Sequence, residues 1–211
     1  IHGVPKDMLT IELGDVYPEL KSLRLRGRVV GNKVLPYWNR AQFGERAEQA
    51  QAPVLLWADD PIELFFLQVQ GSGRVQLADG KTVRIGYADQ NGHPYQSIGR
   101  WLVAQGELPL EQASMDGIKR WAEANPHRLN ELLNANPSYV FFRELPASNT
   151  GPVGALGVPL SAGRSIAVDP RHVPLGAPVF LSTTHPLSAT PLQRLMLAQD
   201  TGGAIKGVVR A

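Results

Sequence analysis

Glycine and proline interrupt the chain at short intervals, and this spacing is the strongest limit on its fold. There are 21 Gly and 17 Pro among the 211 residues. Glycine tolerates turn conformations that other residues avoid, and proline lacks the backbone N–H that regular elements need. Such spacing favours short strands joined by tight turns over a helical bundle. Because 43% of the residues are hydrophobic and 19% are charged, the chain can bury a core, and we expect a mainly β protein with a few helices.

The composition also excludes several classes of function. The chain has no cysteine, which rules out a thiol nucleophile, disulfides and cysteine-based metal sites. Its five histidines do not follow a metal-binding spacing, so we expect neither a metal nor another cofactor. A formal net charge of +2 is too small to neutralise a phosphate backbone, so we expect no nucleic-acid partner.

Neither end of the sequence carries a targeting signal. The longest apolar run, residues 52–58, is far shorter than a membrane span. The chain begins at Ile1 without a methionine and stops at Ala211 in an apolar stretch. We therefore interpret both ends as edges of a longer polypeptide, and any membrane anchor would lie in a segment outside these residues.

Alternating apolar and polar residues predict two hairpins in the first hundred residues. Residues 24–30 and 33–35 predict the first, and residues 75–77 and 83–85 predict the second. The Asp-Gly pair at positions 79–80 favours a type I′ turn in the second hairpin.

A helical block follows these hairpins. Pro94 and Gly106 bound the first expected helix, Ser114 is a suitable N-cap for the second, and Pro126 starts a third that ends before Pro137. We expect the apolar stripes of these helices to pack on a barrel.

The strand pattern then returns, and a shift in composition places a domain boundary near residue 108. Residues 1–108 form the first predicted domain, and residues 109–211 form a helical bridge with a second β domain. The expected strands of the second domain cover residues 139–142, 153–158, 165–168, 178–181 and 195–198.

Carboxylates are scarce in the second β region, since only Asp169 and Asp200 occur after residue 145. Asp200 ends an apolar strand and is followed by Thr201, Gly202 and Gly203, which leave backbone N–H groups and room for a ligand. The alternative is that Asp200 caps its own turn. Asp169 precedes a proline, a common turn position, and we give it a secondary, structural role.

A second candidate site lies at the end of the apolar run 63–70, which predicts a strand with Gln68 and Gln70 on one face. Two amides followed by small residues and a cation suit a ligand rich in hydroxyl and amide groups. The alternative is a β-bulge or a tight barrel corner. The residues that follow the two amides are Gly71, Ser72, Gly73 and Arg74.

Five motifs, in this order, resemble the membrane-bound lytic murein transglycosylase A family. Any one of them is weak evidence, but five at similar spacing over nearly the whole chain are specific. They occupy residues 65–75, 87–100, 136–142, 163–169 and 199–207.

The resemblance implies a double-psi β-barrel with a smaller β-barrel domain inserted into it and a groove between them for a glycan strand. Residues 1–108 resemble most of the inserted domain, and residues 109–211 resemble the bridge and the central part of the double-psi barrel. The family's barrel carries three aspartates. Asp169 and Asp200 match the first two, and the third, the family's catalytic acid, is expected just after Ala211.

The implied reaction cleaves the β-1,4 bond between N-acetylmuramic acid and N-acetylglucosamine of peptidoglycan without water. The muramyl C6 hydroxyl attacks its own C1 and leaves a 1,6-anhydro end. Because this nucleophile is tethered to the ring, one carboxyl group can serve as acid and then as base. We assign Asp200 to tuning or orienting that acid, and the alternative is that Asp200 is itself the proton donor.

The expected sugar-binding residues are Gln68, Gln70, Gly71, Ser72, Gly73, Arg74, Gly202 and Gly203. Tyr87 and Tyr95 are expected either to stack on the sugar or to be half-buried packing residues. The resemblance also implies a periplasmic protein, anchored in the outer membrane through a segment absent here, and we expect a monomer.

Two alternative functions remain open. The Asp-Thr-Gly sequence at 200–202 looks like an aspartic protease loop, which would require a homodimer because the chain holds one copy. Double-psi barrels can also bind polysaccharide without cleaving it, so a non-catalytic glycan-binding module is the second alternative.

Overall fold

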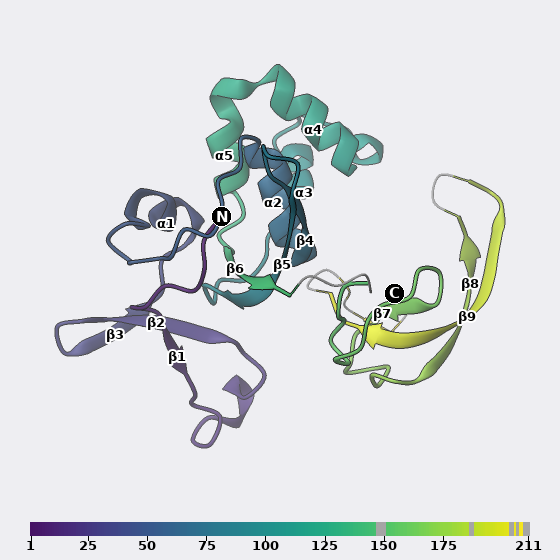
Figure 1. The fold of residues 1–211 in the computed structure, drawn as a ribbon, viewed down its shortest axis with the longest axis horizontal. Helices are drawn as coiled ribbons and strands as arrows, with labels where there is room; N and C mark the ends of the chain where they lie inside the picture. Colours follow the sequence, from purple (N-terminus) through teal and green to yellow (C-terminus); the bar gives the residue numbers. More distant parts are fainter. Residues whose placement is uncertain (147–150, 186–187, 203–204, 206, 209–211) are drawn as a thin grey trace. The chain divides into compact units, whose positions relative to one another are not determined.

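The computed structural model describes residues 1–146, 151–185, 188–202, 205 and 207–208. The chain divides into two compact units, Ile1–Leu145 and Pro146–Ala211. The strands that the structure describes form three sheets of three strands each (Figure 1). The mainly β class is confirmed. None of the helices in the described ranges combines the length and apolarity needed to cross a membrane.

The first sheet of unit 1 is antiparallel, in the order β1-β2-β3. It contains β1 (Leu9–Ile11), β2 (Leu25–Val30) and β3 (Lys33–Pro36). The predicted hairpin over residues 24–35 is confirmed, since β2 pairs with β3 around a turn in which Gly31 has a φ of 61°. A 3-10 turn (Pro18–Leu20) lies between β1 and β2, and the short helix α1 (Arg40–Arg46) follows β3.

The second sheet of unit 1 has the order β4-β5-β6 and is also antiparallel. It contains β4 (Ser72–Gln76), β5 (Thr82–Gln90) and β6 (Val140–Leu145). The predicted hairpin between β4 and β5 is confirmed, but the prediction of a type I′ turn within it is wrong. A type I′ turn needs two central residues with positive φ, and of the pair at 79–80 only Gly80 has one, at 82°.

The actual turn is a type I turn closed by a glycine bulge. The Gly80 N–H donates to the Leu77 carbonyl at 2.9 Å, and the Leu77 N–H donates to the Lys81 carbonyl at 2.8 Å. Asp79 keeps a negative φ, and its carboxylate accepts a hydrogen bond from the Lys81 N–H at 3.0 Å. This local bond removes the need for a second residue in the left-handed region.

The strand predicted over residues 63–70 is wrong, because these residues form helix α2 (Pro61–Gln70). Asp60 caps this helix by accepting hydrogen bonds from the N–H groups of Ile62 and Glu63. Proline occupies the first turn, and Gly71 ends the helix in the left-handed conformation at φ 79°. These start and stop signals outweigh the short polar–apolar alternation at the end of the run. In a helix, residues two apart point in different directions, so Gln68 is buried and Gln70 is exposed.

Helix α2 shares one core with the three helices that follow β5. These are α3 (Ile98–Ala104), α4 (Met115–Ala124) and α5 (Leu129–Asn134), joined by 3-10 turns over Leu110–Gln112 and Pro126–Arg128 (Figure 1). The composition shift near residue 108 therefore lies inside unit 1, within a layer of helices that pack together. The buried residues of this core are Ile62, Phe65, Ile98, Leu102, Ile118, Trp121, Ala122, Leu132 and Leu133.

The predicted helix boundaries are confirmed at Ser114 and at Gly106, which follows the end of α3 with a φ of 72°, and are shifted at Pro94. Ser114 caps α4 by accepting a hydrogen bond from the Gly117 N–H at 3.2 Å. The helix expected to begin at Pro94 instead begins at Ile98, because Ser97 is the N-cap and accepts from the Arg100 N–H at 3.3 Å. Serine is among the preferred N-cap residues, because its hydroxyl accepts a hydrogen bond from a backbone N–H in the first turn.

The described strands of unit 2 form a mixed sheet in the order β7-β9-β8. Strand β9 (Pro191–Asp200) runs parallel to β7 (Ser165–Ala167) and antiparallel to β8 (Pro178–Thr184). The strand predicted over 153–158 is wrong. That segment makes one bridge, from Val153 to Pro159, around a glycine turn in which the Gly157 N–H donates to the Gly154 carbonyl.

Candidate active site

Asp200 lies where the sequence placed it, at the end of a strand. Its carbonyl accepts a hydrogen bond from the Val168 N–H at 3.0 Å, which fixes its backbone to the chain that leaves β7. Its Oδ1 atom accepts a hydrogen bond from the Ala155 N–H at 3.0 Å. Among the described residues, the segment that crosses the end of β9 thus anchors the Asp200 side chain.

The segment around Gly154 can approach β9 this closely because it lacks a side chain there. A Cβ added at Gly154 would lie 2.4 Å from the Gln199 carbonyl oxygen. The Leu156 N–H donates to this same carbonyl at 3.0 Å. The close approach brings the Ala155 N–H within reach of the Asp200 carboxylate.

A hollow of about 400 Å³ opens beside Asp200. Of the described residues that line it, Asp200 is the only one with an ionisable side chain. The remaining walls are small or apolar residues with two hydroxyl groups. The lining consists of Gly151, Pro152, Leu160, Ser161, Ala162, Gly163, Ser165, Ile166, Ala167 and Asp200. A single carboxylate can therefore act on a neutral polar ligand here with little competing charge.

Asp169 is fully buried and held by several donors, at 1% exposure. The Arg171 guanidinium donates to both carboxylate oxygens, at 3.0 and 2.6 Å. The Gly207 N–H donates to Oδ2 at 2.8 Å, and the Arg171 N–H donates to Oδ1 at 3.2 Å. The hydrogen bonds from Arg171, followed by the one from Gly207, hold the pKa of Asp169 well below its usual range. Asp169 is therefore an ionised group that links Arg171 to Gly207 within unit 2.

Gln68 lies inside unit 1. Its Oε1 accepts a hydrogen bond from Arg40 at 2.7 Å, and its Nε2 donates to the Val140 carbonyl at 3.2 Å. Gln68 is 4% exposed. Its amide group links α2 to α1 and β6, so it is not available to a ligand in the described structure of unit 1.

Sequence reasoning missed Arg40, the residue that Gln68 binds. Arg40 also donates to the carbonyls of Asn136 and Ser138, at 3.1 and 2.7 Å, and its guanidinium lies over the ring of Phe65. No carboxylate in the described part of the chain pairs with it. The three acceptors come from 28 to 98 residues away, so no local pattern could have revealed them.

The other residues of this motif are more accessible. Gln70 and Arg74 are exposed, and Ser72 is half-buried. Within the described ranges the side chains of these three residues have no hydrogen-bond partner. Gly73 is confined, since a Cβ there would lie 2.5 Å from Leu67 Cδ1. The turn from α2 into β4 thus presents an amide, a hydroxyl and a guanidinium together.

Tyr87 lies on β5 next to this turn. A Cβ added at Gly71 would be 3.8 Å from the Tyr87 Cβ. The Tyr87 hydroxyl accepts a hydrogen bond from Arg24 at 2.8 Å, and burial raises its pKa. Tyr95 is 40% exposed, and burial of the remainder raises its pKa as well. Both tyrosine side chains are partly buried and partly exposed. This is compatible with stacking on a sugar and with a role in packing.

The glycines after Asp200 are placed only in part. Gly202 is half-buried, and a Cβ there would lie 2.7 Å from Ile205 Cγ1. The prediction for Gly203 lies outside the described residues.

Comparisons with known protein families match both units. A family profile described as "MltA specific insert domain" matches residues 1–143, and one described as "3D domain" matches residues 164–211. The chain belongs to the MltA family. It is 37% identical over 161 residues to Membrane-bound lytic murein transglycosylase A of Escherichia coli K12. That alignment covers 73% of this chain and 44% of the relative, so the chain spans less than half the length of this curated MltA protein.

Solved MltA structures share the fold. The crystal structure of MltA from Neisseria gonorrhoeae in its monoclinic form has a TM-score of 0.82 and 44% identity, covering 100% of this chain and 59% of that one. The crystal structure of E. coli MltA with bound chitohexaose has a TM-score of 0.68 and 33% identity, covering 82% of this chain and 53% of that one. Because the chain resembles MltA proteins, we no longer interpret residues 200–202 as an aspartic protease loop.

Proposed function

We propose that this chain is the central part of a lytic murein transglycosylase that cleaves peptidoglycan between N-acetylmuramic acid and N-acetylglucosamine. Membership of the MltA family supports this activity. The related E. coli enzyme has been solved with chitohexaose, a chain of N-acetylglucosamine units joined by β-1,4 bonds. A glycan strand is therefore the proposed substrate.

The observation that carries the proposal is the Asp200 carboxylate beside the hollow in unit 2. A retaining or inverting glycosidase needs two carboxyl groups, one as acid and one as nucleophile or base. Among the described lining residues Asp200 is the single carboxylate. A transglycosylase needs only one carboxyl group that moves a proton, because the muramyl C6 hydroxyl is already held near C1 and supplies the nucleophile by proximity. Asp200 can therefore assist that one group without acting as a nucleophile or as a base for water.

In the proposed mechanism one carboxyl group moves one proton. It donates this proton to the glycosidic oxygen as the C1–O bond breaks, then accepts the proton of the C6 hydroxyl as the new C1–O bond forms. We assign this acid to a carboxyl group soon after Ala211. Asp200, anchored by the Ala155 N–H, would stand near it. A neighbouring carboxylate raises the pKa of such an acid, which the acid needs at neutral pH.

Asp169 takes a positioning role in this scheme. Its bond to the Gly207 N–H fixes the chain four residues before Ala211, on the path to the expected acid. Sugar binding is assigned to Gln70, Ser72 and Arg74, whose side chains are free to donate to hydroxyl and acetamido groups. Gln68 supports this turn from inside, through its bond with Arg40.

The remaining parts of the proposal concern the whole protein. We propose that it is a periplasmic monomer, held at the outer membrane through a segment not included here. The curated relative is named as membrane-bound, which supports this location.

The test is digestion of intact peptidoglycan sacculi by the full-length protein and its Asp200→Asn variant, with the released fragments identified by mass. We expect 1,6-anhydro ends from the parent and a loss of about 100-fold in rate for Asp200→Asn, the usual scale for acid–base assistance. Asp79→Asn, in the exposed β4–β5 turn, is the matched control and should digest normally.

Three outcomes would contradict the proposal. Reducing ends would make the protein a hydrolase. An Asp200→Asn variant as fast as the control would remove Asp200 from the site. Sacculi that are bound but left intact by the parent would make it a glycan-binding module.

A further inference from the structure

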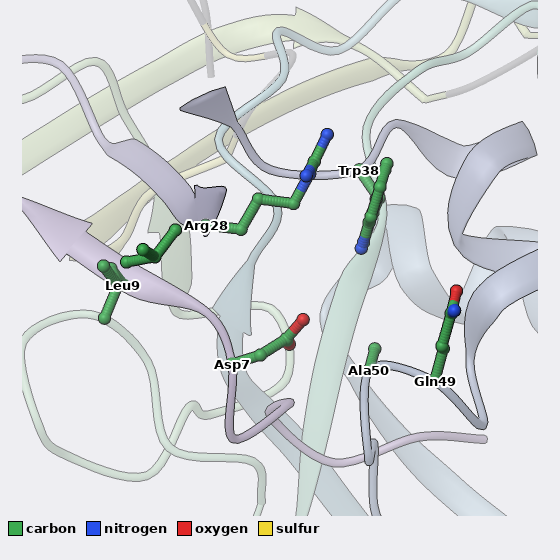
Figure 2. Close-up of a pocket in the computed structure, with 7 residues that line it drawn as sticks. Asp7, Leu9, Arg28, Trp38, Gln49 and Ala50 are labelled. Atoms are coloured by element: carbon green, nitrogen blue, oxygen red, sulfur yellow. The ribbon is translucent and has the colours of Figure 1, made fainter. Parts of the chain in front are cut away.

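A second hollow, of about 470 Å³, lies in unit 1 and is not part of the site described above. Three stretches of chain line it: the residues around β1, strand β2, and the residues flanking α1. Figure 2 shows Asp7, Arg28, Trp38 and Gln49 around the same space. The lining residues are Asp7, Leu9, Arg28, Val29, Trp38, Gln49 and Ala50.

Arg28 supplies a cation to this hollow, and none of the ion pairs among the described residues includes it. Its guanidinium lies over the Trp38 ring at 3.4 Å from the ring centre. Its Nε is buried, and no acceptor in the described part of the chain bonds to it. Buried donors in proteins are nearly always hydrogen-bonded, and a guanidinium presents a flat set of donors that matches a carboxylate.

Asp7 supplies an acceptor to the same hollow. Its Oδ1 accepts a hydrogen bond from the Tyr37 hydroxyl at 2.7 Å, and no donor among the described residues bonds to its Oδ2. Asp7 and Arg28 both line the hollow but do not form an ion pair with each other, so the hollow presents a positive and a negative group at separate points. Burial and the bond with Asp7 raise the pKa of Tyr37 above its usual range, so Tyr37 remains a neutral donor.

These charges limit what the hollow can hold. One guanidinium favours a single negative charge, and Asp7 would repel a doubly charged group such as phosphate. Asp7 also offers an acceptor for an N–H group a few atoms away from that charge. Leu9, Val29 and Ala50 add an apolar wall for a small side chain. A carboxylate beside an amide N–H and a small side chain is the chemistry of the last residue of a peptide.

We propose that this hollow binds the carboxyl-terminal residue of a short peptide, with its carboxylate on Arg28 and its amide N–H on Asp7. The probes are N-acetylalanine and N-acetylalaninamide, which differ only in the carboxylate. Each is titrated into the whole protein while the indole N–H signal of Trp38 is followed by NMR.

We expect N-acetylalanine to shift this signal with saturation, and N-acetylalaninamide to bind about tenfold more weakly or not at all, because it lacks the charge that Arg28 holds. The Arg28→Gln substitution should also weaken the binding of N-acetylalanine by about tenfold. Arg46→Gln is the matched control. Arg46 also lies over the Trp38 ring, at 5.1 Å, but does not line the hollow, so its removal should leave binding unchanged.

Two results would overturn the proposal: equal binding of the acid and the amide, or inorganic phosphate binding more tightly than N-acetylalanine. Both are measured on the parent protein, so they decide the question even if Arg28→Gln does not fold. Equal losses of affinity for N-acetylalanine in Arg28→Gln and Arg46→Gln would also contradict the proposal, because the loss of any nearby positive charge would then explain the effect.

Discussion

At the scale of single residues, unit 1 contains a buried arginine that pairs with no carboxylate in the described part of the chain. Arg40 is 9% exposed and satisfies three oxygen atoms of Gln68, Asn136 and Ser138. Desolvation of such a cation is costly, and its hydrogen bonds and the rings around it offset that cost. The residue therefore joins α1 to α2 and to the chain that enters β6.

Replacing Arg40 should destabilise the protein much more than replacing a surface arginine. Arg40→Met leaves these buried acceptors without donors, and we expect a loss of about 3 kcal/mol in the free energy of unfolding. The control Arg46→Met, on the same helix, should change it by less than about 0.5 kcal/mol. Urea denaturation followed by circular dichroism measures both, and equal effects would show that the Arg40 bonds contribute little.

Asp169 predicts a dependence of stability on pH. Its pKa is lowered in the folded state, so the folded state binds fewer protons than the unfolded state when this carboxyl titrates. The stabilisation is then fully present above the unfolded pKa of about 3.9 and is lost as pH falls below it. Unfolding curves of the parent and Asp169→Asn should differ at neutral pH and converge from about pH 4 downward. A difference that stays constant across this range would contradict the assignment.

At the scale of elements, helix α2 depends on its ends. Asp60 caps its beginning, and Gly71 ends it with a φ of 79°. A side chain at this left-handed position is strained by about 1 kcal/mol, although space is available around it.

Two glycine substitutions should therefore have opposite signs. Gly71→Ala should lower the free energy of unfolding by about 1 kcal/mol. Gly44→Ala, inside α1 and with no atom within 4 Å of the added Cβ, should raise it by about 0.5 kcal/mol, because alanine favours a helix. Thermal melting of both variants checks the signs, and a stabilised Gly71→Ala protein would refute this account of the helix end.

The elements also show why sequence reasoning succeeded in some places and not in others. Short-range signals were sufficient for the turn at Gly31 and the N-cap Ser114. They were misread at 63–70, where the alternation of Gln68, Val69 and Gln70 suggested a strand although Asp60 and Gly71 mark a helix.

In the candidate site, too, some features could be predicted from the sequence and others could not. Asp200 could be predicted because its strand and the residues after it are adjacent in sequence. The anchor from Ala155 and the bond between Asp169 and Gly207 span 45 and 38 residues. Such contacts depend on the folded chain path, so the sequence alone could not show them. The buried position of Gln68 was hidden for the same reason.

At the scale of the whole molecule, unit 1 joins its two sheets through paired polar side chains. Arg26 on β2 donates to both carboxylate oxygens of Asp89 on β5, at 2.9 and 2.8 Å. Asn91, with no exposed surface, donates to the carbonyls of Trp38 and Pro137. The motif that contains Asp89 and Asn91 is thus explained by the packing of unit 1.

A double-mutant cycle should measure this connection. Arg26 and Asp89 are 12% and 18% exposed, so we expect a coupling of about 2 kcal/mol between Arg26→Gln and Asp89→Asn in the free energy of unfolding. The exposed pair Lys81 and Asp79 should show no measurable coupling. Additive effects of Arg26→Gln and Asp89→Asn would mean that the two sheets are held together by other contacts.

The hydrogen bond from Gly207 to Asp169 has a consequence for the order of events during synthesis. A growing chain makes Asp169 long before it makes Gly207, so the loop between them stays open until almost the end of this sequence has emerged. If the acid follows Ala211 as proposed, it is synthesised later still and reaches its working position only once that loop has closed.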